Sequence, residues 1–242
     1  MGRGRRKAMG MGLLGLTLLF TGSRLGAAEA VGEPGPWGGA AVAVEPFAGY
    51  TTLAMGLLSA DLQNTGYRGS INQGFELGLE VPVHFGSFYV APRLYGLWSG
   101  HASRVNAYSA DLAVGAVPLE LGAGYTLRQG RWSLNGGLYA GGLLGWYDDE
   151  FVSVTNAADH GSSTGSAWTY VGEGKLGCQA DLGHFFLGLD LGYRYAVIPE
   201  WSFTRKSSTG PTTTQVAKNA KGQDSVLDYS GGTAEGQFGY RF

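Results

Sequence analysis

The sequence predicts an all-β fold, an eight-stranded antiparallel up-and-down transmembrane β-barrel. Apolar and polar side chains alternate with a period of two in about eight segments, which is the pattern of strands with two different faces. Short turns and long polar segments alternate between these strands, as in membrane barrels. Glycine supplies 43 of the 242 residues without any triplet period. Small barrels use such glycines to fit large side chains inside a narrow interior.

The N-terminal 30 residues are predicted to be a signal peptide that is removed on export. Four basic residues lie within the first seven positions, and the uncharged run 8–22 and three alanines follow. That run is too short for a membrane helix, which needs about 20 apolar residues. Residues 31–40 are rich in Gly and Pro and are expected to be a flexible segment. The barrel domain is then predicted over 41–242.

Composition excludes several classes of protein. Residues 31–242 hold 12 Lys and Arg against 18 Asp and Glu, so no basic surplus suggests a nucleic-acid partner. Cys178 is the single cysteine, so the exported chain is expected to contain no internal disulfide. The spacing of Cys and His does not fit a zinc site, and we expect no metal or other cofactor.

The eight strands are predicted over residues 42–50, 75–85, 88–98, 109–127, 132–147, 168–182, 187–195 and 228–242. The segment 75–85 is the most regular, because large apolar residues occupy every odd position up to Phe85. Tight turns are predicted at 86–87, 128–131 and 183–184, and long loops at 53–72, 99–108, 148–166 and 198–227.

The segment 109–127 changes phase. Leu112 and Val114 share one parity, whereas Leu119 and Leu121 share the other. This predicts a β-bulge near Val117, since a bulge moves the apolar set from one face to the other. Proline is tolerated at such a position, and Pro118 follows.

The last strand has one apolar face that ends in aromatic residues, listed in order as Ala234, Gly236, Phe238, Tyr240 and Phe242. This ending resembles the C-terminal strand of bacterial outer-membrane β-barrel proteins, although Gln237 stands where that family usually has glycine. The resemblance implies that the barrel-assembly machinery reads Phe238, Tyr240 and Phe242. From about residue 41 onward the chain resembles the eight-stranded OmpA/OmpX-type barrels, which implies a monomer in the outer membrane.

The aromatic residues sort into two predicted belts, as expected at the two membrane interfaces. The upper belt comprises Tyr50, Phe75, Trp98, Trp146, Trp168 and Tyr195. The lower belt comprises Phe85, Phe88, Tyr125, Trp132, Phe185, Tyr240 and Phe242.

The opposite face of the strands carries charges of both signs. They are Glu45, Glu76, Glu80, Arg93, Glu120, Glu173, Lys175, Asp181, Asp190, Arg194, Glu235 and Arg241. Unpaired charges in a narrow lumen are costly, so cross-barrel ion pairs are expected. Tyrosines 89, 95, 139 and 147 share this face. We therefore predict a lumen that is plugged by side chains.

The longest loop is basic, with Arg205, Lys206, Lys218 and Lys221. At the height of anionic headgroups such residues favour phosphate, so lipopolysaccharide and outer-membrane lipid are the expected partners.

Three kinds of function are compatible with these features. The first is a non-enzymatic outer-membrane protein whose loops serve envelope structure or surface interaction. The second is a small channel for ions or solutes. The third is a lipid A-modifying enzyme, because His101 and His160 each precede a serine by two residues. In the lipid A deacylases that serine is followed by asparagine, whereas Arg104 and Ser163 follow here, so no enzyme is expected.

The glycines at 172, 174 and 177 match the sequence of the dinucleotide-binding motif G-x-G-x-x-G but lack its structural context. That motif requires a strand that turns into a helix, and these glycines lie inside a period-two strand.

Overall fold

The computed structural model describes residues 40–242, except for 57, 61–69, 106–107, 157 and 220. The predicted signal peptide and the entry segment up to residue 39 lie outside the described residues. No helix among the residues described is long and apolar enough to cross a membrane.

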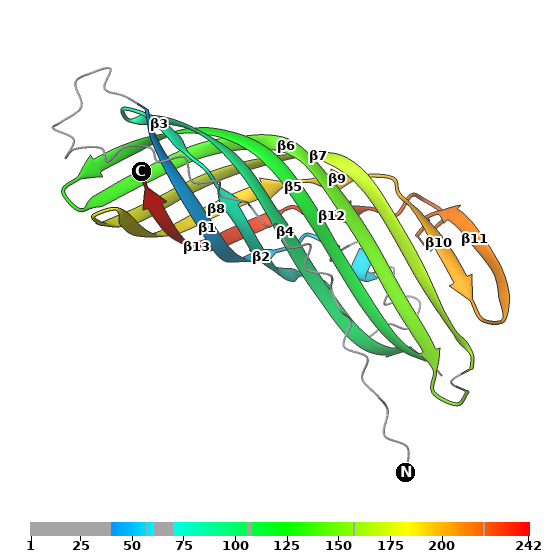
Figure 1. Cartoon of the computed structure of the whole chain (residues 1–242). Coiled ribbons are helices and arrows are strands. Elements are labelled where there is room, and N and C mark those ends of the chain that lie inside the picture. The colour runs from blue at the N-terminus through cyan, green and yellow to red at the C-terminus, as the bar shows by residue number, and fades with distance from the viewer. Residues whose placement is uncertain (1–39, 57, 61–69, 106–107, 157, 220) are drawn as a thin grey trace, which may run out of the picture. The chain divides into compact units, whose positions relative to one another are not determined.

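Eight long strand positions close into a hydrogen-bonded ring (Figure 1). The ring strands are β1 (Ala41–Thr52), β2 (Gln73–Glu80) with its continuation β3 (Val83–Phe85), β4 (Phe88–Val105), β5 (Tyr108–Gln129), β6 (Trp132–Ser153), β7 (His160–Leu182), β8 (Phe185–Tyr195) and β13 (Gly231–Arg241). Each pairs antiparallel with its neighbours, and β13 pairs with β1 to complete the circle. The predicted eight-stranded antiparallel barrel is confirmed.

Three two-residue turns join neighbouring strands at one end of the ring. Their glycines Gly86, Gly130 and Gly183 have φ angles of 67°, 61° and 89°, which residues with a Cβ rarely adopt. The predicted tight turns are therefore confirmed. At this end the chain also closes, because the Phe242 amide donates to the Val42 carbonyl at 3.0 Å.

The predicted strand 75–85 is interrupted at Pro82, which divides it into β2 and β3. Proline lacks an amide proton and cannot donate to the ladder. The Pro82 carbonyl still accepts from the Ala43 amide at 3.0 Å, and the Val81 amide donates to Pro92. The two pieces therefore occupy one position in the ring.

The predicted bulge near Val117 is wrong. β5 pairs with β6 without a shift from Tyr108↔Ser153 to Gln129↔Trp132. Even-numbered residues of β5 face inward along its whole length, so Val114 and Glu120 are both buried. Along β5 the surroundings of the inner face change, from the apolar core at Leu112 and Val114 to the charged lumen at Glu120. The change of parity in the sequence records that change of surroundings.

The predictions of long loops at 99–108 and 148–166 are also wrong, because most of these residues are in strands. The hairpin of β4 and β5 continues to the pair Val105↔Tyr108, and the hairpin of β6 and β7 continues to Val152↔His160. β4 to β7 thus run beyond the shorter ring strands as a curved sheet (Figure 1). Strands of about 9 to 11 residues suffice to cross a bilayer, so the remainder lies outside it.

Four short strands lie in or at the ends of the predicted loop 198–227: β9 (Val197–Ile198), β10 (Ser202–Ser207), β11 (Gly210–Val216) and β12 (Leu227–Asp228). β10 pairs with β7 and β11 with β10, so this hairpin widens the extended sheet. β9 pairs with β12 in a separate two-stranded sheet.

An apolar core fills the space between the extended sheet and the inward-folded loops. It includes Leu53, Met55 and Ile71 from the first loop and Ile198, Trp201, Leu227 and Tyr229 from the last. These side chains pack against Leu112, Val114 and Tyr147 of β5 and β6. These buried residues form an apolar cap at this end of the barrel.

The outer wall carries large exposed apolar side chains, as a lipid-facing surface requires. In the upper belt the register places Tyr50, Phe75 and Trp98 on three successive strands. The row continues through Gly115 to Trp146. A Cβ on Gly115 would lie 2.1 Å from the Trp146 ring, so the glycine makes room for that ring.

Candidate functional site

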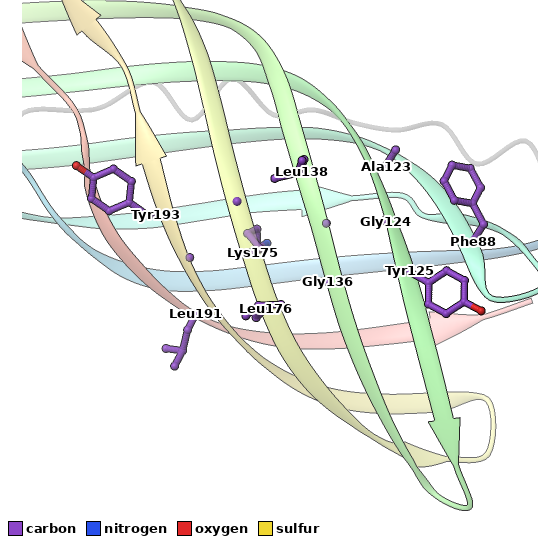
Figure 2. A pocket seen from close by; sticks show the side chains of 13 residues that line it. Phe88, Ala123, Gly124, Tyr125, Gly136, Leu138, Lys175, Leu176, Leu191 and Tyr193 are labelled. Atoms are coloured by element: carbon purple, nitrogen blue, oxygen red, sulfur yellow. The ribbon is translucent and has the colours of Figure 1, made fainter.

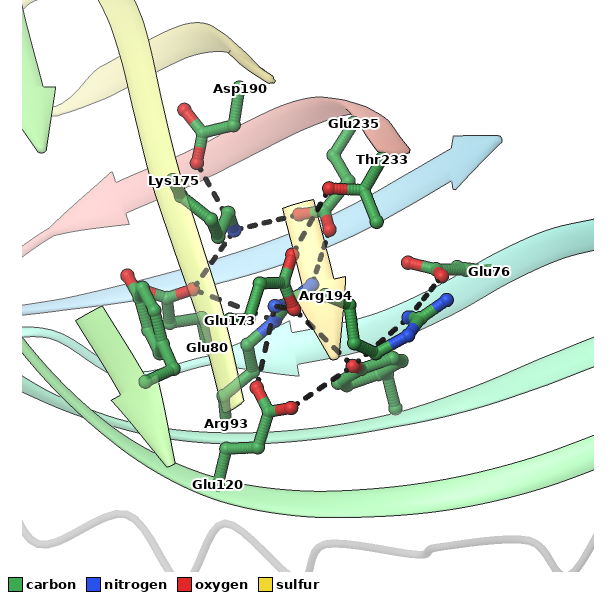
Figure 3. A network of polar contacts seen from close by, with 12 residues as sticks. Glu76, Glu80, Arg93, Glu120, Glu173, Lys175, Asp190, Arg194, Thr233 and Glu235 are labelled. Carbon is green, nitrogen blue, oxygen red and sulfur yellow. Dashed lines mark hydrogen bonds and ion pairs between the residues drawn. The ribbon is translucent and has the colours of Figure 1, made fainter. Parts of the chain in front are cut away.

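The inward charges of the ring strands form a buried network in the lumen, below the apolar cap (Figure 3). The register of the strands alone places several of these charged residues at directly paired positions. Glu80, Arg93 and Glu120 occupy successive positions on β2, β4 and β5. On the other wall Glu173 lies opposite Arg194, and Asp190 lies opposite Glu235.

Arg93 is the centre of this network. Its Nη1 lies 2.7 Å from Glu173 Oε2 and 3.6 Å from Glu120 Oε2, and its Nη2 pairs with Glu235. Its Nε lies 3.8 Å from Glu80. The side chain is fully buried, so this one guanidinium links four strands across the lumen. A buried cation without such partners would cost several kcal/mol.

Two aromatic rings clamp the same guanidinium. Its Cζ lies 4.4 Å from the Phe47 ring centroid and 4.3 Å from the Tyr95 ring centroid. Cation–π contacts of this kind strengthen when both groups are removed from water. The Tyr95 hydroxyl donates to Glu120 at 3.2 Å. The rings and carboxylates together fix Arg93 across the barrel.

Lys175 holds a second part of the network. Its Nζ lies 2.8 Å from Glu235, 3.2 Å from Asp190 and 3.6 Å from Glu80. Glu235 therefore bridges Lys175 and Arg93 through its two oxygens.

Arg194 joins the network to the apolar cap. Its Nη1 pairs with Glu76 at 2.5 Å, and its Nη2 donates to Thr51 Oγ1 at 2.8 Å. Its Nε donates to the Tyr229 carbonyl at 3.1 Å. The Tyr229 hydroxyl reaches the Gly115 carbonyl at 2.9 Å on the opposite wall. Tyr229 was not among the predicted site residues, although it lies in the predicted strand 228–242 and shares the odd parity of the inward Glu235.

Inward glycines supply the space for the large side chains. A Cβ on Gly122 would lie 2.3 Å from the Tyr139 ring, and one on Gly124 would lie 2.4 Å from the Tyr89 ring. The two tyrosine hydroxyls are 3.3 Å apart, and Tyr139 donates to Glu80 at 2.8 Å. Tyrosines and glycines therefore interlock in the lumen.

The buried charges do not balance. Seven buried carboxyl groups, namely Glu45, Glu76, Glu80, Glu120, Glu173, Asp190 and Glu235, accompany the three cations Arg93, Lys175 and Arg194. Glu45 is only 4% exposed and has no hydrogen bond or ion pair to any residue that the structure describes. The interior is thus acidic in excess of its internal cations.

Arg241 and Asp181 lie apart from this network. Their side chains pair at 2.8 Å and are partly exposed near the short-turn end of the barrel. The guanidinium of Arg241 also lies 5.0 Å from the Phe186 ring centroid. The structure thus places both of these predicted lumen residues at the mouth of the barrel.

The terminal aromatics gather beside β8. Phe185 stacks on Phe238 at 5.6 Å and meets Tyr240 edge-on at 5.1 Å. Tyr240 in turn contacts Phe242 at 4.9 Å. Phe238 and Phe242 are exposed on the outer wall.

The four basic residues of the predicted lipopolysaccharide contact are not gathered on one face. Arg205 lies over the Phe151 ring at 5.2 Å, on the inner side of β10, and the next residue, Lys206, points to the other side. Lys218 pairs with Asp224 in a separate turn, and Lys221 is exposed there.

The two His-x-Ser pairs lie on strands rather than in loops. His101 is in β4, and His160 begins β7 with its Nδ1 3.1 Å from the Ala158 carbonyl. At the same rim Tyr108 donates to Asp159 at 2.7 Å, and this bond raises the pKa of the Tyr108 hydroxyl. The part of the chain that the structure describes contains no cluster of three His, Cys, Asp or Glu that could hold a metal ion.

A shallow groove of about 840 Å³ crosses the outer wall from β4 to β8. Figure 2 shows Phe88 and Tyr125 at one end and Leu191 and Tyr193 at the other. Lys175 contributes to the lining, but its amine pairs with lumen carboxylates. The groove belongs to the apolar wall that faces lipid.

Comparison with known proteins yields a match in structure alone. No family model and no curated protein sequence matches the chain. A major outer-membrane protein from Thermus thermophilus superposes with a TM-score of 0.56 at 13% identity, covering 84% of this chain and 100% of that one. OprG from Pseudomonas aeruginosa gives a TM-score of 0.46 at 16% identity, covering 86% and 98%. Neisserial surface protein A gives 0.42 at 15% identity, covering 84% and 97%.

The first of these similarities covers most of this chain, and the apolar outer wall is the surface that such a fold presents to lipid. The chain therefore has the fold of the small β-barrel proteins of bacterial outer membranes.

Proposed function

We propose that this protein is a non-enzymatic component of a bacterial outer membrane, with a lumen closed to solutes and an extracellular sheet that makes surface contacts. The observation that carries the proposal is Arg93, whose buried guanidinium links carboxylates on four strands across the lumen. An eight-stranded barrel has an interior just wide enough to be filled by side chains. The apolar cap closes the same path a second time.

The proposed partners follow from this placement. The exposed apolar wall would contact membrane lipid, and the C-terminal aromatics Phe238, Tyr240 and Phe242 would be read by the assembly machinery. All four basic residues for which lipopolysaccharide contact is proposed, Arg205, Lys206, Lys218 and Lys221, are exposed. We propose a monomer, because the closed ring leaves no strand edge within the membrane.

A small cation channel is the second candidate, and one observation favours it. The excess of buried carboxyl groups over cations would attract cations into any continuous water path.

Single-barrel conductance in a planar bilayer decides between them. We expect small, irregular currents from the wild-type barrel and larger ones from Arg93→Ala, which removes the central link. Arg131→Ala is the matched control, because Arg131 is exposed in a turn. A large and steady wild-type conductance with cation selectivity would refute the closed lumen and establish the channel.

A further inference from the structure

The extended sheet carries a cleft of about 470 Å³ that the closed lumen does not explain. It spans β6, β7 and β10, where Glu150, Ser162 and Lys206 occupy directly paired positions. Phe151 of β6 packs toward the apolar core. Because side chains alternate along a strand, Glu150 and Lys206 face the opposite, solvent-facing side.

The charges along this row are kept apart. Two strand spacings separate Glu150 from Lys206, about 9 to 10 Å between backbones, with Ser162 between them. Both charged side chains are exposed, and neither forms an ion pair or hydrogen bond with another residue of the described chain. An acid and a base therefore flank one hydroxyl without neutralising each other.

The acidic end of the row contains two like charges that repel each other. Asp111 of β5 lies directly opposite Glu150 on the same face. Like charges in directly opposed positions destabilise a strand pair. An ammonium group placed between them would remove this repulsion. Metal binding is not favoured, because no cluster able to hold a metal ion occurs among the residues described.

The basic end offers several hydrogen-bond donors. Lys206 adjoins Ser162, and Ser208 and His160 line the next row of the cleft. The Nδ1 atom of His160 faces the Ala158 carbonyl, which directs the other ring nitrogen away from that contact. An ammonium with neighbouring hydroxyls and an imidazole suits the several oxygens of a phosphate better than the two of a carboxylate.

We propose that this cleft binds a zwitterionic aminoalkyl phosphate, with its ammonium between Asp111 and Glu150 and its phosphate at Lys206 and Ser162. The proposal rests on the surface role proposed above and names the ligand chemistry of that surface.

The position of the cleft selects the source of such a ligand. Glu150 lies four residues beyond Trp146, the member of the upper aromatic belt on the same strand. This corresponds to about 13 Å along the strand, at roughly 3.3 Å per residue, or about 10 Å in height for a strand tilted by about 40°. Headgroups of the surrounding bilayer therefore lie too low, and the ligand would be a soluble molecule or a substituent on a surface saccharide.

Titration of the folded barrel in nanodiscs with O-phosphoethanolamine tests the proposal, followed by calorimetry or by NMR shifts. We expect saturable binding that weakens about tenfold or more in Glu150→Gln and in Lys206→Met. Ethanolamine alone and inorganic phosphate alone should bind the wild-type protein at least as weakly as O-phosphoethanolamine binds these variants, since each engages only one end of the row. Lys221→Met is the matched control, because Lys221 is exposed outside the cleft.

Absence of saturable binding, or equal binding by all variants, would overturn the proposal. Equal binding of phosphate alone would also overturn it, because the acidic end would then play no part. Nanodiscs with phosphatidylethanolamine as the added ligand separate the sources, and competition by that lipid would refute the assignment to a ligand above the membrane. Conductance is measured separately, so failure here leaves the closed lumen standing.

Discussion

Individual side chains in the lumen differ sharply in how well they are paired. Glu235 contacts both Arg93 and Lys175, whereas Glu45 is also buried but forms no ion pair with a cation among the residues described. Removing one partner of a buried pair is strongly destabilising, but removing a buried charge that has no partner relieves a desolvation cost. Two glutamates on the same face are thus expected to respond in opposite ways.

We expect Glu45→Gln to leave the barrel unchanged or more stable, and Glu235→Gln to lower the free energy of unfolding by about 3 to 5 kcal/mol. Both substitutions keep the shape of the side chain, so packing is nearly constant. Urea unfolding in detergent micelles, followed by the gel shift of the folded barrel, measures the difference. A larger loss for Glu45→Gln than for Glu235→Gln would contradict the pairing described here.

At the scale of single elements, β5 shows how one strand can serve two surroundings without a bulge. Its even-numbered residues face inward throughout, toward the apolar cap at Leu112 and toward the ionic network at Glu120. The odd-numbered residues meet lipid at Leu119 and water at Asp111.

Cysteine labelling tests this uninterrupted phase. In a background in which Cys178 is changed to Ser, we expect Asp111→Cys to react rapidly with a charged maleimide and Leu112→Cys to resist it, because Leu112 is 3% exposed. The rates are compared on intact cells or proteoliposomes. Faster labelling at position 112 than at position 111 would support the bulge predicted from the sequence.

The outer face of β7 gives a second prediction for a single strand. Leu176 is 73% exposed and lies between the upper aromatic Trp168 and the lower turn at Gly183. We expect Leu176→Arg to cost about 2 to 4 kcal/mol, as arginine near the bilayer midplane does. Thr164→Arg, on the same face of β7 but beyond the aromatic belt, is the control and should cost little. Equal folded yields of the two variants in lipid vesicles would contradict the membrane placement.

For the whole molecule, closure depends on the last residues of the chain. Phe242 donates its amide to Val42, and its ring projects onto the outer wall beside Tyr240. A ring that is exposed to lipid contributes little to the packing of the barrel, yet it is available for recognition before the barrel closes.

Phe242→Ala should therefore lower the yield of folded barrel in cells much more than it lowers stability after refolding in detergent. Heat-modifiable protein in the membrane fraction measures the yield, and urea unfolding measures the stability. Leu134→Ala, which removes an exposed apolar side chain far from the C-terminus, is the control. Equal cellular yields of the two variants would argue against a role in assembly.

The sequence by itself determined the barrel, its short turns and the face to which most strand segments turn, with residues 112–116 of β5 as an exception. These depend on local alternation and on glycine at turns, which any single strand displays without its neighbours. The inward position of Arg93, Glu173 and Glu235 was readable for the same reason. The choice of partners was not, because the side chains that meet come from strands as far apart in the chain as β4 and β13.

Only the tertiary structure decided how the two ends of the interior are filled. Leu112 and Val114 face inward and pack against loops from both ends of the chain. No local sequence pattern predicts such a contact. The same holds for the strand extensions: the polar stretches after Trp98 and Tyr147 resemble loops, yet they pair because their neighbours continue beside them. Closure into a ring fixes the register of every strand at once, and that constraint exists only when all eight are present.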